Sequence, residues 1–154
     1  MTAHRPAVLT LERFLPYRLS TLSNRVSQIV SETYKDKFAL SVTEWRIMAV
    51  LGEYPGASAD EVSAKTQIEK SIISRALKKL LTRRLVVREV DSADRRRHNL
   101  SLTLTGQDVY KQIVPVSYDY EAELLKCFSK HERDQFDALV DRLYQHAETI
   151  LIKD

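Results

Sequence analysis

Apolar side chains recur every three or four positions from about residue 10 to residue 36. They are Leu11, Phe14, Leu15, Leu19, Leu22, Val26, Ile29 and Val30. This spacing places them on one face of an α-helix, so the pattern predicts one long amphipathic helix. Because a proline ring clashes with the preceding helical turn, we expect this helix to bend near Pro16.

Two further helices are marked by residues that can cap their first turns. Ser41 and Glu44 precede apolar residues at helical spacing, and Ser58 and Glu61 precede Val62. In such a pair the serine hydroxyl and the glutamate carboxylate each bind a backbone N–H group of the first turn. We therefore expect a helix that stops before the sequence EYPG, and a short helix around Val62 that is followed by the turn TQI.

The helix predicted after TQI has an apolar face and a basic face. The apolar face should pack on the core and consists of Ile68, Ile72, Ile73, Ala76, Leu77, Leu80 and Leu81. The opposite face carries Lys70, Ser71, Ser74, Arg75, Lys78 and Lys79. Such cations and hydroxyls bind phosphates and base edges, and two helices around a short turn are typical of a helix-turn-helix. The alternative is a helical hairpin with an ordinary polar outer face.

The period of the pattern changes from helix to strand after this basic helix. Residues 85–90 (LVVREV) have strand composition, and in residues 99–105 (NLSLTLT) three leucines, Leu100, Leu102 and Leu104, alternate with polar residues. The two segments predict a β-hairpin around the sequence DSADRRRH. A hairpin with arginines at its tip, directly after a recognition helix, forms a winged helix-turn-helix whose tip can reach phosphates or the minor groove of DNA.

The turn of this hairpin carries Arg95, Arg96, Arg97 and His98. We expect Asp94 to pair with Arg96 and stiffen the loop. Arg95 is then the first candidate for a DNA contact and Arg97 the second. His98 is interpreted as a neighbour of a phosphate.

Two amphipathic helices are predicted after the hairpin. The first, in residues 107–128 with an expected bend at Pro115, carries Val109, Ile113, Val116, Tyr120, Leu124, Leu125 and Phe128. The second is capped by Ser129 and Glu132 and carries Phe136, Leu139, Val140, Leu143, Ala147, Ile150 and Leu151. These two helices are strongly apolar, and little of their own chain remains for them to bury against. We therefore expect them to pack with the first helix and with a second copy of themselves.

Composition fits a mainly helical globular protein of 154 residues, 44% hydrophobic and 29% charged. Three glycines are too few for glycine-rich phosphate loops. No apolar run approaches the roughly 18 residues that span a bilayer, and the first residues, MTAHRPAV, lack the apolar stretch of a secretion signal. We therefore expect a cytoplasmic protein with no membrane partner. The single Cys127 forms no internal disulfide, which fits a reducing compartment.

Charge is unevenly distributed along the chain. Residues 65–97 contain eleven Lys or Arg and four acidic residues, a net charge of +7, so the remainder of a chain with a total of +3 carries −4. A basic segment in an acidic scaffold is typical of a nucleic-acid-binding protein.

Catalysis is disfavoured by the arrangement of the histidines. His4, His98, His131 and His146 are scattered, without the spacing of a zinc motif or an adjacent nucleophile. We therefore expect no enzyme activity, no metal and no cofactor. An architectural DNA-binding protein with little sequence preference is a further alternative to a regulator.

The segments LSVTEWRIMAVL and ASADEVSAKTQIEKSIISRALKKLLTRRLVVREVDSADRRRHNLSLTLTG resemble the winged-helix core of the MarR family of bacterial transcription regulators. The most specific part is Asp94-Arg95-Arg96, followed by Ser101-Leu102-Thr103 and Gly106, which matches the wing of that family and its exit into the next helix.

The resemblance implies a homodimer that binds a pseudo-palindromic operator in double-stranded DNA, and it favours a ligand-responsive repressor. It implies an N-terminal dimerisation helix in residues 1–40, a winged helix-turn-helix domain in residues 41–105 and C-terminal dimerisation helices in residues 106–154. A small, often aromatic or phenolic acid or its thioester would release the DNA.

Candidate residues for this effector are Tyr17, Arg18, Trp45 and Arg46, because aromatic rings can sandwich a ring and cations can hold a carboxylate. The alternative is that Trp45 belongs to the core and Arg18 to a surface or dimer salt bridge. Redox-responsive members of the family use a cysteine in the first helix, whereas Cys127 lies near the end of the fifth. We interpret Cys127 as a packed thiol, with a redox-responsive or unregulated DNA-binding protein as the alternative function.

Overall fold

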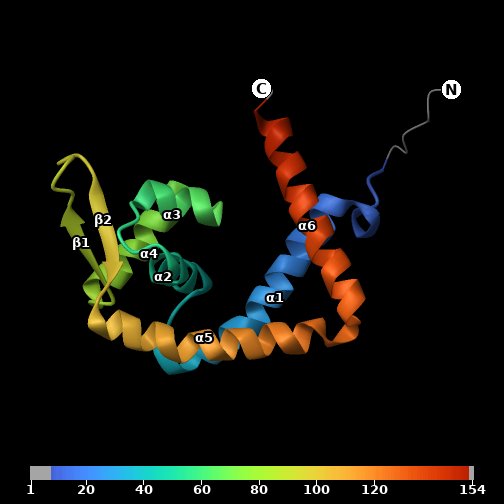
Figure 1. Cartoon of the computed structure of the whole chain (residues 1–154), viewed down its shortest axis with the longest axis horizontal. Helices are drawn as coiled ribbons and strands as arrows, with labels where there is room; N and C mark the ends of the chain where they lie inside the picture. Colours follow the sequence, from blue (N-terminus) through green and yellow to red (C-terminus); the bar gives the residue numbers. More distant parts are fainter. Residues whose placement is uncertain (1–7, 153–154) are drawn as a thin grey trace. The chain divides into compact units, whose positions relative to one another are not determined.

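The computed structural model describes residues 8–152 and is mainly helical, with one two-stranded antiparallel hairpin (Figure 1). The expected fold class is confirmed. The first seven residues, which include His4, and the last two lie outside the described residues. The order is η1 (Leu11–Arg13), α1 (Leu15–Phe38), α2 (Val42–Glu53), α3 (Ala59–Thr66), α4 (Lys70–Thr82), β1 (Val86–Val90), β2 (His98–Leu102), α5 (Leu104–Leu124), η2 (Leu125–Cys127) and α6 (Lys130–Leu151).

The first helix begins at the proline rather than bending at it. A short 3-10 turn, η1, ends at Arg13, and Pro16 occupies the first turn of α1. Backbone N–H groups there have no intrahelical acceptor, so proline costs no hydrogen bond. The expected bend is therefore wrong. The helix ends at Ala39, whose backbone is left-handed with φ 50°.

The predicted caps form at three helix starts, with one difference. Ser58 with Glu61 and Ser129 with Glu132 each make both bonds of the capping box. Ser41 accepts a hydrogen bond from the Glu44 N–H at 3.1 Å, but the Glu44 carboxylate does not complete the box. That carboxylate is buried and faces another helix.

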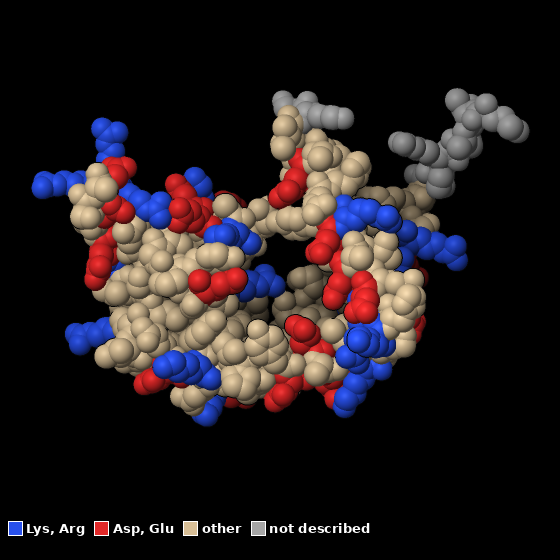
Figure 2. All heavy atoms as spheres, viewed as in Figure 1, with Lys and Arg blue, Asp and Glu red and all other residues tan. Residues whose placement is uncertain are grey.

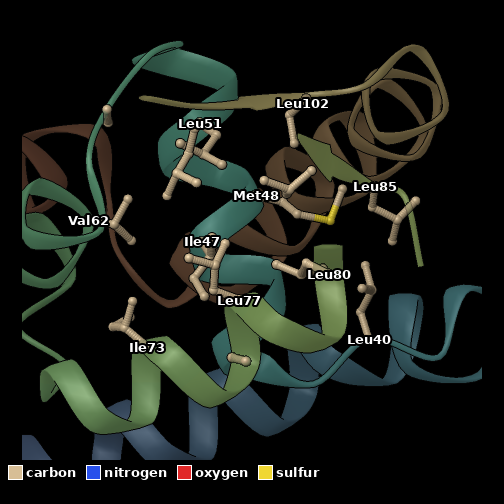
Figure 3. Close-up of a cluster of buried hydrophobic side chains, with 14 of the residues drawn as sticks. Leu40, Ile47, Met48, Leu51, Val62, Ile73, Leu77, Leu80, Leu85 and Leu102 are labelled. Carbon is tan, nitrogen blue, oxygen red and sulfur yellow. The ribbon is translucent and has the colours of Figure 1, made fainter. Parts of the chain in front are cut away.

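The hydrophobic core lies among α2, α3, α4 and the hairpin, with Tyr34 and Leu40 from the end of α1 (Figure 3). Residues with almost no exposure include Ile47, Met48, Leu51, Val62, Ile73, Leu77, Leu80 and Leu100. Of the apolar face predicted for α4, Ile72 is the exception, because 38% of its surface is exposed. The core residues leave the basic face of α4 in solvent.

The hairpin pairs Val86 with Leu102 and Val90 with His98. Leu100 and Leu102 are buried, as the alternation predicts, but Leu104 is 81% exposed and starts α5 instead of extending the strand. Helix α5 starts there because the Thr103 hydroxyl accepts the Gly106 N–H at 3.0 Å, an N-terminal cap. Gly106 is required at this position, since a Cβ there would lie 2.0 Å from the carbonyl oxygen of Leu85.

The outer edge of β2 is also bonded to the chain between α2 and α3. The Gly56 N–H donates to the Leu100 carbonyl at 2.8 Å, and the Leu100 N–H donates to the Ala57 carbonyl at 3.0 Å. These two bonds attach the base of the hairpin directly to the helix-turn-helix.

The chain divides into two compact units at Pro115, which lies inside α5. Each unit has a different degree of burial. The first contains all of the buried core described above. In α6, by contrast, none of the described side chains is buried, and its apolar residues Phe136, Leu139, Val140, Leu143, Tyr144, Ile150 and Leu151 are exposed. The three functional ranges 1–40, 41–105 and 106–154 stay a prediction.

Among residues 8–152, no helix is both long enough and apolar enough to cross a lipid bilayer.

Candidate nucleic-acid interface

The outward face of α4 presents the six residues that the sequence selected. Lys70, Ser71, Ser74, Arg75, Lys78 and Lys79 are all exposed. Two of them already have partners: Lys70 lies 3.2 Å from the Asp60 carboxylate, and the Ser71 hydroxyl donates to Glu69 at 2.8 Å. The Lys70 pair is about three-quarters exposed and therefore weak, so it can exchange for a phosphate.

A groove runs between α4 and the start of α2. Its walls are formed by Ser41, Thr43 and Glu44 on one side and by Ile72, Arg75, Ala76, Lys78 and Lys79 on the other. The Thr43 hydroxyl and the cations of α4 thus open onto the same groove, a combination that suits a DNA phosphate. The sequence did not single out Ser41 or Thr43 for binding: the cap role of Ser41 already explained it, and Thr43 lies in the first turn of α2 with no pattern to mark it.

The tip of the wing is ordered by two aspartates. Asp91 accepts the N–H groups of Ala93 and Asp94 at 2.8 and 3.1 Å, and the Asp94 carboxylate accepts the Arg96 N–H at 3.0 Å. The pKa of Asp91 is lowered, first by a hydrogen bond from the Asn99 side chain and then by these backbone donors. Asp94 therefore stiffens the loop through the backbone of Arg96 and not through an ion pair with its guanidinium.

Arg97, and not Arg96, is the arginine whose guanidinium is bonded to the rest of the domain. Its guanidinium donates to both carboxylate oxygens of Glu61 at 2.9 and 2.8 Å, and its Nε donates to Asn99 at 2.9 Å. Glu61 belongs to the capping box of α3, so one carboxylate caps a helix and anchors the wing. The Arg97 hydrogen bonds, more than any other contact, lower the pKa of Glu61 to about 2, while Glu61 raises the pKa of Arg97. The expected side-chain pairing of Asp94 with Arg96 is thereby corrected, because Arg97 makes the internal ion pair, whereas the DNA contacts of the three arginines stay a prediction.

Arg95 and Arg96 are exposed, and their guanidinium groups make no ion pair with any residue in the described range. Figure 2 shows Lys and Arg side chains projecting from the tip of the hairpin, at the upper left. The geometry thus leaves two cations at the tip available to a partner and uses the third to fix the wing.

A second cleft lies between the wing and the start of α3. It is lined by Ser58, Ala59, Asp60, Arg88, Asp94, Arg96, Arg97, His98 and Leu100. His98 and Arg96 therefore share one cleft, as their neighbouring positions suggested. Arg88, on β1, was missed as a candidate, because strand alternation alone did not indicate which face of the hairpin it occupies.

Trp45 belongs to a stack of three aromatic side chains. Its ring lies 5.8 Å from the ring of Tyr34 in α1 and 5.8 Å from that of Tyr110 in α5, measured between centroids. Gly52 permits this packing, since a Cβ there would lie 2.3 Å from the Tyr110 ring. Burial raises the pKa of the Tyr34 phenol, and the charge of Arg46 opposes the increase. Arg46 also donates to the Ser27 hydroxyl at 2.9 Å.

The four effector candidates are not brought together in one chain. Tyr17 and Arg18 are exposed near the start of α1. Trp45 packs on Tyr34, which is further along the same helix by about 25 Å at 1.5 Å per residue. Tyr17 and Trp45 of one chain therefore cannot sandwich one ring. The pair Trp45 and Arg46 does lie together beside α1.

Cys127 is exposed and lies in the 3-10 turn η2, where its thiol approaches the Leu124 carbonyl at 3.5 Å. The interpretation of a packed thiol is wrong, because the short turn leaves the side chain in solvent.

Several known transcription regulators are similar to this chain. The MarR family model matches residues 40–97, which run from just after the end of α1 to the turn of the wing before β2. The transcriptional regulator HosA of Escherichia coli O127:H6 is 27% identical over 104 residues, 68% of this chain and 77% of HosA. A MarR/EmrR family regulator from Acinetobacter sp. ADP1 is 28% identical, with a TM-score of 0.83 over 92% of this chain and 99% of that chain.

BpsR of Bordetella bronchiseptica, whose DNA binding is regulated by 6-hydroxynicotinic acid, shares the fold at 20% identity, with a TM-score of 0.77 over 91% of this chain and 98% of BpsR. Regulators of this family bind DNA and small molecules, typically as dimers. The winged-helix geometry, the matching family model and these relatives agree. In sequence and fold the chain is similar to the MarR family of transcription regulators, which are not enzymes.

Proposed function

We propose that this protein is a homodimeric, ligand-responsive repressor that binds a pseudo-palindromic operator. The observation that carries the proposal is the pairing of two cationic surfaces within one unit, the outward face of α4 and the tip of the wing. The Arg97–Glu61 ion pair holds the wing to α3, so the two surfaces keep a fixed relation to each other. A recognition helix in the major groove and a wing tip at the adjacent backbone or minor groove need such a relation.

The proposed roles follow from position and partners. Ser71, Ser74 and Arg75 would contact base edges from the exposed N-terminal half of α4, and Lys70, Lys78, Lys79 and His98 would contact phosphates. Arg95 and Arg96 would enter the minor groove or bind the backbone. Arg97, predicted as a DNA contact from sequence, is here proposed to act through the position of the wing.

The proposed dimer rests on the apolar surface that the chain leaves exposed. Leu139, Leu143 and their neighbours on α6 are each about half exposed, and so are Leu15, Leu19 and Leu22 on α1. A monomer rarely exposes so many large apolar side chains without a partner, and a second copy of the same chain supplies the same surfaces. The two recognition helices would then read half-sites roughly one DNA turn, ~34–36 Å, apart.

Selection of binding sites from random duplex DNA tests the proposal on all sequences at once. We expect enrichment of an inverted repeat with half-sites about 10 base pairs apart, and a footprint on that sequence over a large excess of competitor DNA. Binding without any enriched sequence would indicate an architectural protein and contradict the proposal. Expression from a promoter that carries the selected site then distinguishes repression from activation. A protein in this role would act on chromosomal DNA, which fits the expected cytoplasmic location.

Regulation by a small aromatic acid or its thioester is the second part of the proposal. Arg46 offers a cation for a carboxylate next to the partly buried Trp45, and Arg18 is a further candidate cation, with Tyr17 beside it on α1. The regulation of BpsR by 6-hydroxynicotinic acid gives a precedent within the fold. Trp45 is the only tryptophan in the chain, so its fluorescence reports directly on this region.

Titration of hydroxybenzoic and hydroxycinnamic acids, with a thioester of each, should change Trp45 fluorescence and release operator DNA over the same concentration range. Arg46→Gln should weaken both effects, whereas Arg25→Gln, which removes a charge elsewhere on α1, should not. If none of these compounds changes either signal, aromatic-acid sensing is contradicted while operator binding is unaffected.

A further inference from the structure

We propose that Arg83 is a positioning residue that fixes the recognition helix to the end of α1, and thereby sets the distance between the two recognition helices of the dimer. The inference rests on the proposed function as a dimeric operator-binding protein. Arg83 was not among the residues predicted to bind DNA, and its contacts point into the protein.

Arg83 lies at the C-terminal end of α4 but caps a different helix. Its Nη2 donates to the Phe38 carbonyl at 2.6 Å and its Nη1 donates to the Ala39 carbonyl at 3.0 Å. Carbonyls at the end of a helix have no intrahelical donor and carry the negative end of the helix dipole. Ala39 ends α1 with a left-handed backbone, a common conformation at a helix end, and the Arg83 guanidinium supplies donors to the carbonyls there.

The same guanidinium neutralises a buried carboxylate in a third helix. Glu44 in the first turn of α2 has a side chain that is only 8% exposed, and its Oε2 lies 3.8 Å from Nη1 of Arg83. A buried carboxylate is costly without a counter-charge. The incomplete capping box at Ser41 has the same origin, since the Glu44 carboxylate faces Arg83 instead of the start of its own helix.

Arg83 therefore joins the end of α4, the end of α1 and the start of α2. Helix α4 packs mainly on α2, α3 and β1. The hydrogen bonds of Arg83 to Phe38 and Ala39 link the end of α4 directly to the end of α1. The link matters because α1 also carries the leucines of the proposed dimer interface, of which Leu22 is the nearest to Phe38. From there to Phe38 the helix extends about 24 Å, and a tilt of about 5° over that length moves its end by ~2 Å, more than half of the 3.4 Å between base pairs.

The test compares Arg83→Gln with Arg84→Gln on the selected operator. Both variants remove one charge at adjacent positions, but the Arg84 side chain has no hydrogen bond or ion pair to a described residue. Binding is measured to the full operator, to a single half-site, and to operators whose spacer is one base pair longer or shorter.

We expect Arg83→Gln to lower the preference for the full operator over the half-site by roughly tenfold, within the range typical of coupling between sites, and to flatten the dependence on spacer length. Arg84→Gln should leave both unchanged. Arg83→Lys should be intermediate, because lysine keeps the charge but lacks the planar fork that serves two carbonyls and a carboxylate. If Arg83→Gln is poorly folded by circular dichroism, Arg83→Lys carries the comparison.

Equal losses of full-site and half-site binding, with an unchanged spacer preference, would overturn the proposal and leave Arg83 with a purely structural role. A DNA-free measurement separates this failure from failure of the proposed function. With spin labels on Lys78→Cys in both protomers, in a Cys127→Ser background, Arg83→Gln should broaden the distribution of label distances relative to Arg84→Gln. Equal widths contradict the proposal, whereas a wild-type protein that dimerises but selects no operator contradicts only the DNA-binding function.

Discussion

The winged helix-turn-helix and the C-terminal helix α6 use similar apolar side chains in opposite ways. In the first region, residues such as Ile47, Leu77 and Leu80 are fully buried within one chain. In α6, Leu139 and Leu143 are about half exposed although they recur at the same helical spacing. Hydrophobic periodicity therefore identifies a helix face that must be covered, but it does not reveal whether the cover comes from the same chain or from another.

Charging the apolar face of α6 should separate the two regions most strongly. Leu139→Asp combined with Leu143→Asp places carboxylates where a second chain would pack. We expect a folded monomer, and operator affinity lower by roughly 10²–10⁴-fold, the gain that joining two binding sites provides. Sedimentation and DNA binding measure the effect, and Gln145→Asp, which adds a charge on another face of α6, should stay dimeric. A double variant that remains a dimer would contradict the proposed interface.

Replacing one leucine by alanine in the winged-helix core and one in α6 tests, through the free energy of unfolding, whether each side chain is buried within one chain or between two chains. Leu80→Ala should lower the free energy of unfolding by roughly 2–5 kcal/mol, because it leaves a cavity in a close-packed core. Its cost should not depend on protein concentration, whereas the cost of Leu143→Ala should arise mainly through dissociation and therefore grow on dilution. Urea unfolding at two protein concentrations measures both. A concentration-independent loss for Leu143→Ala would indicate burial within one chain.

Charged groups show the same contrast within the wing. Arg97 is neutralised by Glu61, while Arg95 and Arg96 at the tip have no such partner among residues 8–152. We expect Arg95→Ala with Arg96→Ala to weaken operator binding and to reduce the slope of log affinity against log salt by about 1 for each phosphate that is no longer neutralised. The helical circular dichroism spectrum should not change. Unchanged affinity and slope would remove the wing tip from the interface.

The wing anchor should show its effect in the pH dependence of stability. The pKa of Glu61 is lowered from 4.5 to about 2, first by its hydrogen bonds with Arg97, so its contribution is complete above the unfolded pKa and is lost as pH falls from there towards 2. Because the pair is partly exposed, the change should be much smaller than that of Leu80→Ala.

Glu61→Gln should reduce the decrease in stability over that acid range, as measured by urea unfolding at a series of pH values. Glu89→Gln, which alters an exposed carboxylate on β1, should keep the wild-type profile. If Glu61→Gln leaves the profile unchanged, the ion pair does not anchor the wing in solution.

Most helices and strands could be predicted from patterns of residues close together in the sequence. The predictions failed where a cap or turn that the pattern did not include set the boundary of an element. The caps at Ser58 and Ser129 depend on residues three positions away, and sequence is sufficient for such contacts. Leu104 continues the alternation of a strand, but the cap at Thr103 starts α5 there. The bend predicted at Pro16 is absent because α1 starts there, after the 3-10 turn η1. The prediction failed because no sequence pattern marks that turn.

The candidate interface shows the same limit. The exposed face of α4 could be predicted, because periodicity alone separates it from the core. The partner of Arg97 could not, since Glu61 is 36 residues away and its role in the cap of α3 already accounted for it. Arg83 was missed for the same reason, because its acceptors at the end of α1 are 44 and 45 residues distant.

The backbone bonds between Leu100 and the segment Gly56–Ala57 have a consequence for the exchange of amide hydrogens. A two-stranded hairpin alone opens easily, but here one edge of β2 pairs with β1 and Leu100 bonds to Gly56 and Ala57 on the other edge. Its N–H can therefore exchange with solvent only when the helix-turn-helix also opens, whereas the N–H groups at the tip can exchange through local motion. The base of the wing should thus share the lifetime of the folded domain, whereas the tip should exchange at a rate set by its own aspartate hydrogen bonds.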